Sequence, residues 1–336
     1  MNKIPVVALT GHLGAGKTTL LNYVLQQPGA RVGVVVNDFG DINIDAALVT
    51  GQVDEPASIA GGCLCCLLDD DSLDQALEKL THPRLGIDVV IVEASGVAEP
   101  GALAQLIRFS GVERVRLGGV VDVVDAVHYF DTVDTVRTVP ARFAAASLVV
   151  INKCDQLPPA DRAAMLFRIE QRIREVNPGV PILRSSKGKV DPILLFDTAC
   201  MYDPPDQLPF AAASRAAQPH AGHQHAAAAT ASSRGPVDPG HLIDLLEDPP
   251  RGAYRIKGRV VVRSGRHLRG YVVNLVGRSV HIASTAVATA DNELVAIGMD
   301  LDASEAHPRL VRALAPADRA PAAGLRRLQQ YRRLSL

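Results

Sequence analysis

The sequence has little that would tie it to a membrane, to nucleic acid or to an oxidising compartment. It contains no tryptophan, only 4% aromatic residues, and five cysteines in 336 residues. Its formal net charge of −1 gives no bulk attraction to nucleic acid or to anionic membranes. No apolar run approaches the roughly 20 residues that span a bilayer, and the N-terminal MNKIPVVALTG lacks the layout of a signal peptide. We therefore expect a cytoplasmic protein without a nucleic-acid or membrane partner, as a monomer or weak homodimer.

Three of the few cysteines nevertheless stand together, as Cys63, Cys65 and Cys66 in the stretch GGCLCC. In a reducing compartment a structural disulfide is disfavoured, and clustered cysteines more often bind metal or do redox work. The spacing does not fit a closed structural zinc finger, and Cys154 and Cys200 stand apart. Soft thiolates favour Zn²⁺ or Cu⁺, and Co²⁺ is also feasible. We favour a metal site, with buried packing cysteines or a redox pair as alternatives.

Short runs of β-branched residues alternate with helical stretches from residue 3 to about residue 200. Continuous apolar strands separated by helices are typical of a parallel sheet that is covered on both faces. We therefore predict an α/β domain with a mostly parallel sheet flanked by helices. The predicted strands are Ile4–Leu9, Arg31–Val36, Ile87–Val92, Arg116–Val121, Ser147–Ile151 and Val180–Leu183, and the predicted helices are Lys17–Gln27, Ser72–Leu80, Gly101–Phe109 and Ala160–Val176.

Residues 204–240 have a different composition, rich in alanine, proline, serine and glycine. A stretch that can bury so little is expected to be a flexible linker. It carries His220, His223 and His225, which either collect metal at low affinity or are inert.

Beyond the linker the pattern changes to that of a smaller α+β unit. From Tyr254 onward RIKGRVVV, RGYVVNLV, SVHIAS and ELVAIGM indicate four strands, and a helix is predicted over Ala306–Leu314. The basic tail GLRRLQQYRRL is interpreted as a solvated helix rather than a nucleic-acid arm, because it lacks interleaved aromatic residues. The predicted domains are 1–203 and 241–336, with the linker 204–240 between them.

The sharpest motif is GHLGAGKTT, which begins at Gly11 directly after a predicted strand and opens a predicted helix. This is the context of a phosphate-binding P-loop, in which glycines let backbone N–H groups converge on phosphate oxygens. Lys17 would supply a charge to the β- and γ-phosphates, and Thr18 a hydroxyl to Mg²⁺. The motif predicts a P-loop NTPase fold and a nucleoside triphosphate site with contacts from Gly11, Gly14, Ala15, Gly16, Lys17, Thr18 and Thr19.

A second motif, VIVEASGVAEP, places Glu93 at the end of an apolar strand. P-loop NTPases hold Mg²⁺ through a water at this position. Gly96 can bring its N–H to the γ-phosphate, which would make the loop a switch that responds to hydrolysis. We assign the catalytic roles to Lys17, Thr18 and Glu93, with Thr18 and Glu93 as the Mg²⁺ pair.

The base is indicated by NKCD, which follows the strand SLVVI. The Asp155 carboxylate can accept both the N1–H and the exocyclic amino hydrogens of guanine, whereas adenine lacks that pair of donors. Lys153 can lie along the purine face, and Asn152 can tie this loop to the P-loop. The motif favours GTP over ATP.

Taken together, the motifs GHLGAGKTT, VNDFG, GGCLCC, VEASG and NKCD resemble those of the metal-linked P-loop GTPases, which include the urease, hydrogenase and cobalamin accessory proteins. Within that group the set is most similar to the CobW-like metallochaperone subfamily. The resemblance covers residues 3–200 strongly and the region after 250 more loosely. It implies GTP binding and slow hydrolysis, with Mg²⁺ on the nucleotide, coupled to delivery of zinc or cobalt to a client metalloprotein.

The resemblance also implies a transition-metal site formed by Cys63, Cys65 and Cys66, with a carboxylate such as Asp38 or Asp41. Members commonly carry a long histidine run in the linker, a tryptophan in the C-terminal domain and a glutamate where these aspartates stand, and this sequence departs from all three. A nucleotide-gated metal buffer or scaffold without directed transfer is the alternative function.

Overall fold

The computed structural model describes residues 3–27, 30–36, 57–58, 71–94, 99–135, 141–195, 226–287, 289–317 and 320–335. The chain divides into two compact units, Asn2–Tyr202 and Asp203–Leu336, called here the N-terminal and C-terminal units. Within the described part of the chain, no helix combines the length and apolar character that crossing a membrane requires.

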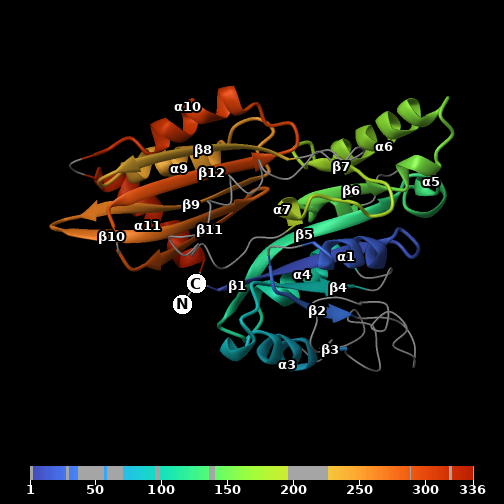
Figure 1. Ribbon diagram of the computed structural model, residues 1–336, viewed down its shortest axis with the longest axis horizontal. Helices are drawn as coiled ribbons and strands as arrows, with labels where there is room; N and C mark the ends of the chain where they lie inside the picture. Colours follow the sequence, from blue (N-terminus) through green and yellow to red (C-terminus); the bar gives the residue numbers. More distant parts are fainter. Residues whose placement is uncertain are drawn as a thin grey trace. The chain divides into compact units, whose positions relative to one another are not determined.

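The N-terminal unit is built on a seven-stranded sheet in which every pairing is parallel (Figure 1). Runs such as VVIVE and LVVIN form these strands because β-branched side chains pack well on a sheet buried on both sides. The predicted parallel sheet is confirmed. The strands, in spatial order, are β3 (Ala57–Ser58), β2 (Val32–Val36), β4 (Val89–Glu93), β1 (Ile4–Gly11), β5 (Val115–Asp125), β6 (Leu148–Asn152) and β7 (Ile182–Arg184).

Helices cover this sheet, as predicted. Val6, Val7, Ala8 and Leu9 of β1 are all at most 2% exposed, and because successive side chains of a strand point to opposite faces, both faces of the sheet are covered. The helices are α1 (Lys17–Leu25), α3 (Asp71–Leu80), α4 (Pro100–Arg108), α5 (Tyr129–Thr132), α6 (Arg162–Val176) and α7 (Pro192–Leu195), with short 3₁₀ turns η1 (Pro83–Leu85), η2 (Ala141–Ala144) and η3 (Cys154–Gln156).

The register of the parallel strands brings their carboxyl ends to one edge of the sheet. Leu9 of β1 pairs with Glu93 of β4, and Asp125 of β5 pairs with Asn152 of β6. The strand β5 runs four residues past its predicted end at Val121. This edge is where open parallel sheets bind ligands, and it carries the loops that hold the predicted nucleotide motifs.

In the described residues of the C-terminal unit, a five-stranded antiparallel sheet is packed with three helices, so the predicted α+β class is confirmed. Its core includes Val260, Tyr271 and Leu294 from the sheet and Leu242 and Leu310 from the helices. The strands, in spatial order, are β11 (Ser279–Thr285), β10 (His267–Val276), β9 (Arg255–Ser264), β12 (Asp291–Gly298) and β8 (Ala227–Arg234), and the helices are α9 (Pro239–Glu247), α10 (Ala303–Ala313) and α11 (Ala322–Leu334).

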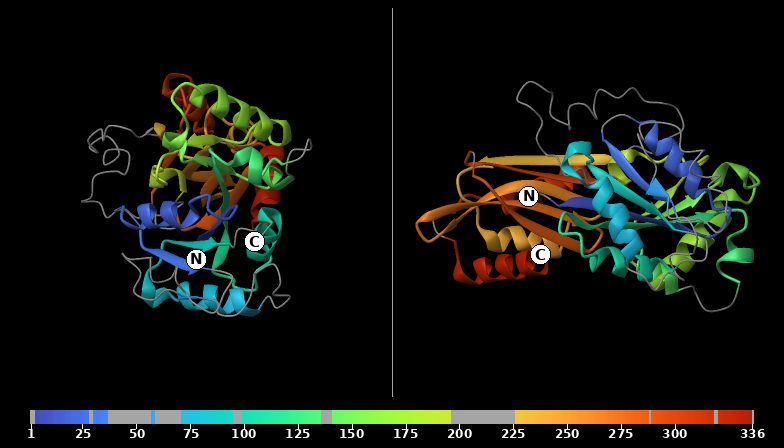
Figure 2. Two further views of the ribbon diagram at one scale, coloured as in Figure 1. Left: turned by 90° about the vertical axis from the view of Figure 1, so that its right-hand side faces the viewer. Right: turned by 90° about the horizontal axis from the view of Figure 1, so that it is seen from below.

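Two predictions about this unit were wrong. The expected linker 204–240 extends too far, because its alanine-rich end forms β8, in which Ala229 and Ala231 are buried. The basic tail is a helix but not a solvated one: α11 lies beside α9 (Figure 2) and buries Leu328 completely. Arg327 of α11 also forms ion pairs with acidic side chains of α9, at 2.7 and 2.8 Å.

Candidate functional site

The loop between β1 and α1 is shaped by glycine. Gly16 has a φ of 98°, in the left-handed region that a Cβ disfavours, and it is the N-cap of α1. A Cβ at this position would lie 2.3 Å from Nδ2 of Asn152. The loop therefore needs glycine there both for its backbone and for its contact with the neighbouring strand, and it leaves the positive N-terminal end of α1 at the edge of the sheet.

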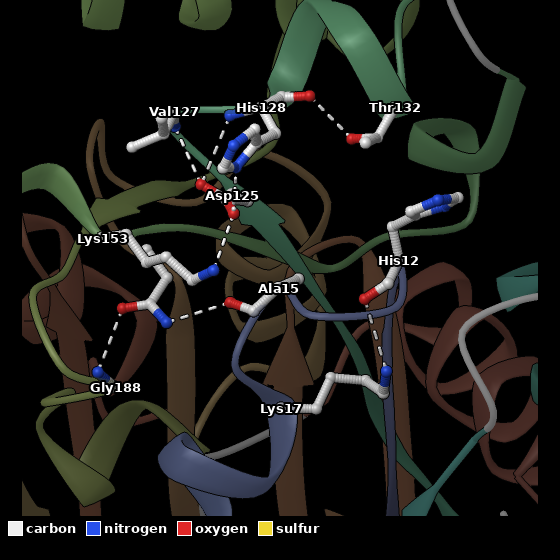
Figure 3. A network of polar contacts seen from close by, with 10 residues as sticks. His12, Ala15, Lys17, Asp125, Val127, His128, Thr132, Lys153 and Gly188 are labelled. Carbon is white, nitrogen blue, oxygen red and sulfur yellow. Dashed lines mark hydrogen bonds and ion pairs between the residues drawn. The ribbon is translucent and has the colours of Figure 1, made fainter. Parts of the chain in front are cut away.

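Lys17 is the first residue of α1, and its side chain is held back against the loop (Figure 3). Its ammonium group donates to the carbonyl of Gly11 at 3.0 Å and lies 3.5 Å from the carbonyl of His12. The residue is only 8% exposed. A cation held at this position is suited to phosphate oxygens that approach the loop backbone.

Thr18 and Glu93 meet across the end of the sheet. The Thr18 hydroxyl donates to Oε1 of Glu93 at 3.0 Å, and Glu93 is 4% exposed at the end of β4. A hydroxyl and a carboxylate are oxygen ligands of the kind that Mg²⁺ prefers, so this pair fits a magnesium ion held directly or through water. Thr19, also predicted to contact nucleotide, is exposed, and Gly96 lies outside the described residues.

Asn152 joins three loops at the end of the sheet. Its side-chain amide donates to the carbonyl of Ala15 in the P-loop, and its side-chain oxygen accepts from the N–H of Gly188 after β7, both at 3.0 Å. Asn152 is 2% exposed. Gly188 has a φ of 67°, and a Cβ there would lie 2.6 Å from the backbone nitrogen of Leu20, so this loop packs directly on α1.

The four residues of the NKCD loop are held unequally. Asn152 is fixed by the two bonds described above. Lys153 has a left-handed φ of 61°, and its side chain donates to Asp125. The N–H of Cys154 donates to the carbonyl of Ser185 at 3.1 Å. Asp155 is exposed, and its carboxylate has no hydrogen-bond partner among the described residues. Three residues thus fix the loop, and the fourth presents a free acceptor pair.

The partner of Lys153 is a residue that none of the sequence motifs contains. The ammonium group of Lys153 lies 2.7 Å from Oδ2 of Asp125, the last residue of β5, and Nδ1 of His128 lies 3.0 Å from the same oxygen (Figure 3). The N–H of Val127 donates to the other oxygen at 2.8 Å. Burial would raise the pKa of the Asp125 carboxyl, but the bonds from Lys153, His128 and Val127 outweigh it, so the pKa lies below its ordinary value.

The predicted transition-metal ligands Cys63, Cys65, Cys66, Asp38 and Asp41 lie outside the described residues. Across the ranges that the structure does describe, no three His, Cys, Asp or Glu side chains gather closely enough to hold a metal ion.

Cys154 is buried inside the NKCD loop, where its thiol donates to the carbonyl of Ile151 at 3.2 Å. Burial raises the pKa of this thiol, which disfavours the thiolate that a metal would need. Cys154 is therefore a packing residue.

A glycine-rich loop between a central strand and a helix, a pair between Thr18 of that helix and Glu93 at the end of the neighbouring strand β4, and an NKCD loop together define a P-loop nucleotide-binding domain. The chain belongs to the CobW/HypB/UreG family: the family's nucleotide-binding domain matches residues 5–184, and the cobalamin synthesis protein cobW C-terminal domain matches residues 226–314.

Similar proteins include the zinc chaperone YjiA of Escherichia coli K12, which is 31% identical over 204 residues, 59% of this chain and 62% of YjiA. The zinc chaperone CobW of Pseudomonas aeruginosa is 32% identical over 228 residues, 57% of this chain and 60% of that protein. The zinc-regulated GTPase metalloprotein activator 1 of Schizosaccharomyces pombe is 30% identical over 203 residues, 57% of this chain and 48% of the relative. The chain thus spans about half to three-fifths of these relatives.

Among solved structures, Zn(II)-bound YjiA GTPase from E. coli is 22% identical, with a TM-score of 0.44, covering 93% of this chain and 99% of that one.

Proposed function

We propose that this protein is a GTP-hydrolysing metallochaperone, which binds zinc or cobalt and delivers it to a client metalloprotein in the cytoplasm. The assignment of GTP as the nucleotide rests on the NKCD loop. Asn152 ties this loop to the P-loop, and the Asp155 carboxylate is exposed as a free hydrogen-bond acceptor. A carboxylate held in this way beside a phosphate site selects guanine, because it accepts two hydrogens that adenine does not present together.

The residues of the P-loop act on the triphosphate by position and charge. Lys17 and the N-terminal end of α1 bind the phosphates, and Thr18 and Glu93 hold Mg²⁺, which would neutralise charge on the β- and γ-phosphate oxygens. Slow turnover is part of the proposal, because the sequence offers no identifiable arginine finger or water-positioning glutamine, groups worth roughly 10³–10⁵ in rate.

The metal part of the proposal rests on the cysteine cluster and on the relatives, two of which are named zinc chaperones. Cys63, Cys65 and Cys66 are proposed as ligands with Asp38 or Asp41. In the sequence the cluster lies between β2 and α3, and α3 is followed by β4, which ends at Glu93. Bound metal deprotonates the thiols, so binding should weaken as pH falls.

Nucleotide titrations with GTP, ATP and XTP in Mg²⁺ test the base assignment. Asp155→Asn should lose the preference for GTP and gain affinity for XTP, because an asparagine amide can donate to the 2-oxygen of xanthine while its oxygen still accepts the N1–H. Asp161→Asn is the matched control, since Asp161 is an exposed carboxylate six residues further along that makes no capping bond. Equal affinity of the unchanged protein for ATP and GTP would contradict the proposal.

Release of zinc to a chromophoric chelator separates a chaperone from a buffer. A chaperone that couples hydrolysis to delivery should release zinc faster with GTP than with a non-hydrolysable GTP analogue. Equal release rates with the two nucleotides would favour the alternative of a nucleotide-gated buffer or scaffold.

A further inference from the structure

A buried carboxylate outside the predicted motifs contacts one motif residue. Asp125 has a side chain 10% exposed, at the end of β5, and its Oδ2 lies 2.7 Å from the ammonium group of Lys153. Strand register places Asp125 directly opposite Asn152, the residue before Lys153. The carboxylate is itself held by the backbone N–H of Val127 and faces His128. The backbone N–H of His128 also donates to Oδ1, at 3.4 Å, so the carboxylate is held by the turn after β5 and by the NKCD loop.

We propose that Asp125 is a positioning residue that sets guanine selectivity by holding Lys153 away from Asp155. The inference rests on the proposed function, because it concerns how the same site recognises its base. No nucleotide motif includes Asp125, and it acts only through Lys153.

The backbone of the loop shows why Lys153 needs an anchor. Lys153 has a φ of 61° and a ψ of 29°, a left-handed conformation that is unfavourable for a non-glycine residue. Its side chain is 25% exposed, so the bond to Asp125 is shielded from bulk water on most sides. A charge-assisted hydrogen bond of this kind offsets the cost of the turn and fixes the direction of the side chain.

The consequence of losing the anchor follows from charge and chain length. Asp155 stands two residues after Lys153, exposed and without a hydrogen-bond partner in the described ranges. A released lysine, on its flexible four-carbon stem, would be the closest cation in the sequence to that carboxylate. An ion pair between them would occupy the oxygens that must accept hydrogens from guanine. ATP does not use those oxygens, so its weak binding would be unaffected.

The test is the ratio of GTP to ATP affinity in Asp125→Asn, measured by titration of the full chain in Mg²⁺. We expect GTP affinity to fall about tenfold, the size that a partly shielded charge-assisted hydrogen bond supports, with ATP affinity within about twofold. Asp134→Asn is the matched control: Asp134 is 6% exposed and pairs with Arg172 at 2.7 Å, but it lies outside the nucleotide motifs. This control should lower thermal stability and leave the ratio unchanged.

A double-mutant cycle shows whether Asp125 acts through Lys153. Adding Asp125→Asn to a Lys153→Gln background should change the GTP-to-ATP ratio less than about twofold, because no ammonium group remains to be released. An unchanged ratio in Asp125→Asn, or equal effects with and without Lys153, would overturn the inference. If the asparagine variant does not fold, Asp125→Glu replaces it: a loss of about threefold supports the proposal, and the parent ratio overturns it. A parent protein without GTP preference would instead refute the proposed function.

Discussion

Asn152→Ala is the substitution whose consequences the structure defines best. The asparagine makes two hydrogen bonds of 3.0 Å, to the Ala15 carbonyl and from the Gly188 N–H, and it is 2% exposed. Alanine would leave two buried backbone groups without partners, at about 1–3 kcal/mol each. Some relaxation is expected around the P-loop, so the free energy of unfolding of the N-terminal unit should fall by about 2–4 kcal/mol. For a unit of this size that corresponds to roughly 5–15 °C in Tm.

The assay pairs differential scanning calorimetry with GTP titration, and Asn177→Ala serves as the control. The Asn177 amide also donates to two backbone carbonyls, those of Phe143 and Ala146, at 3.0 and 3.1 Å, but it belongs to the end of α6 rather than to the nucleotide motifs. Both variants should lose stability, and only Asn152→Ala should also lose GTP affinity, because only that residue holds the P-loop. The reasoning is refuted if Asn152→Ala keeps its Tm and its GTP affinity, or if both variants weaken GTP binding equally.

Three further outcomes follow from particular residues. Gly188→Ala should destabilise the N-terminal unit by more than about 2 kcal/mol, because a Cβ would clash with the backbone of α1. Gly265→Ala is the control: its φ of 62° is similar but the space around it is open, so the loss should be about 1 kcal/mol. Equal losses of stability in calorimetry would contradict this. Ala231→Glu should unfold the C-terminal unit and leave GTP binding intact, while Ala228→Glu, on an exposed position of the same strand, should be nearly neutral in circular dichroism melts. The lowered pKa of Asp125 means that its stabilising effect is present above the pKa of the unfolded carboxyl and is lost as pH falls through the folded pKa. The stability advantage of the parent over Asp125→Asn should therefore begin to decline as pH falls below about 4, and an undiminished advantage at pH 3 would count against the ion pair.

Much of the fold could be predicted because its strands have a strong local signal. Runs such as VGVVV and LVVIN consist mainly of apolar, β-branched residues without alternating polar positions, which is typical of a sheet covered on both faces. The strand β8 escaped prediction because Ala227–Arg234 is built from alanine, serine and threonine, whose weak signal is typical of linkers. Small side chains at Ala229 and Ala231 are instead what lets α10 pack closely over this edge strand.

The candidate site shows the same division between local and distant information. The P-loop and the NKCD loop are contiguous motifs, so their residues could be named from the sequence alone. The pairing of Lys153 with Asp125 joins residues 28 positions apart, and it depends on the register of β5 against β6 and on a left-handed backbone at Lys153. Neither feature has a signature in the sequence, and β5 itself was predicted to end before Asp125.

The measurement that tests the central claim most directly is the zinc affinity of the purified chain, by chelator competition, without nucleotide and with a non-hydrolysable GTP analogue in Mg²⁺. A chaperone whose metal and nucleotide sites communicate should show a change of about 5–150-fold, and zinc must then change GTP affinity by the same factor. Replacing Cys65 and Cys66 with serine should abolish tight zinc binding and the coupling while GTP binding persists. Zinc affinity that is the same with and without the analogue, or that survives the double substitution, would contradict the account.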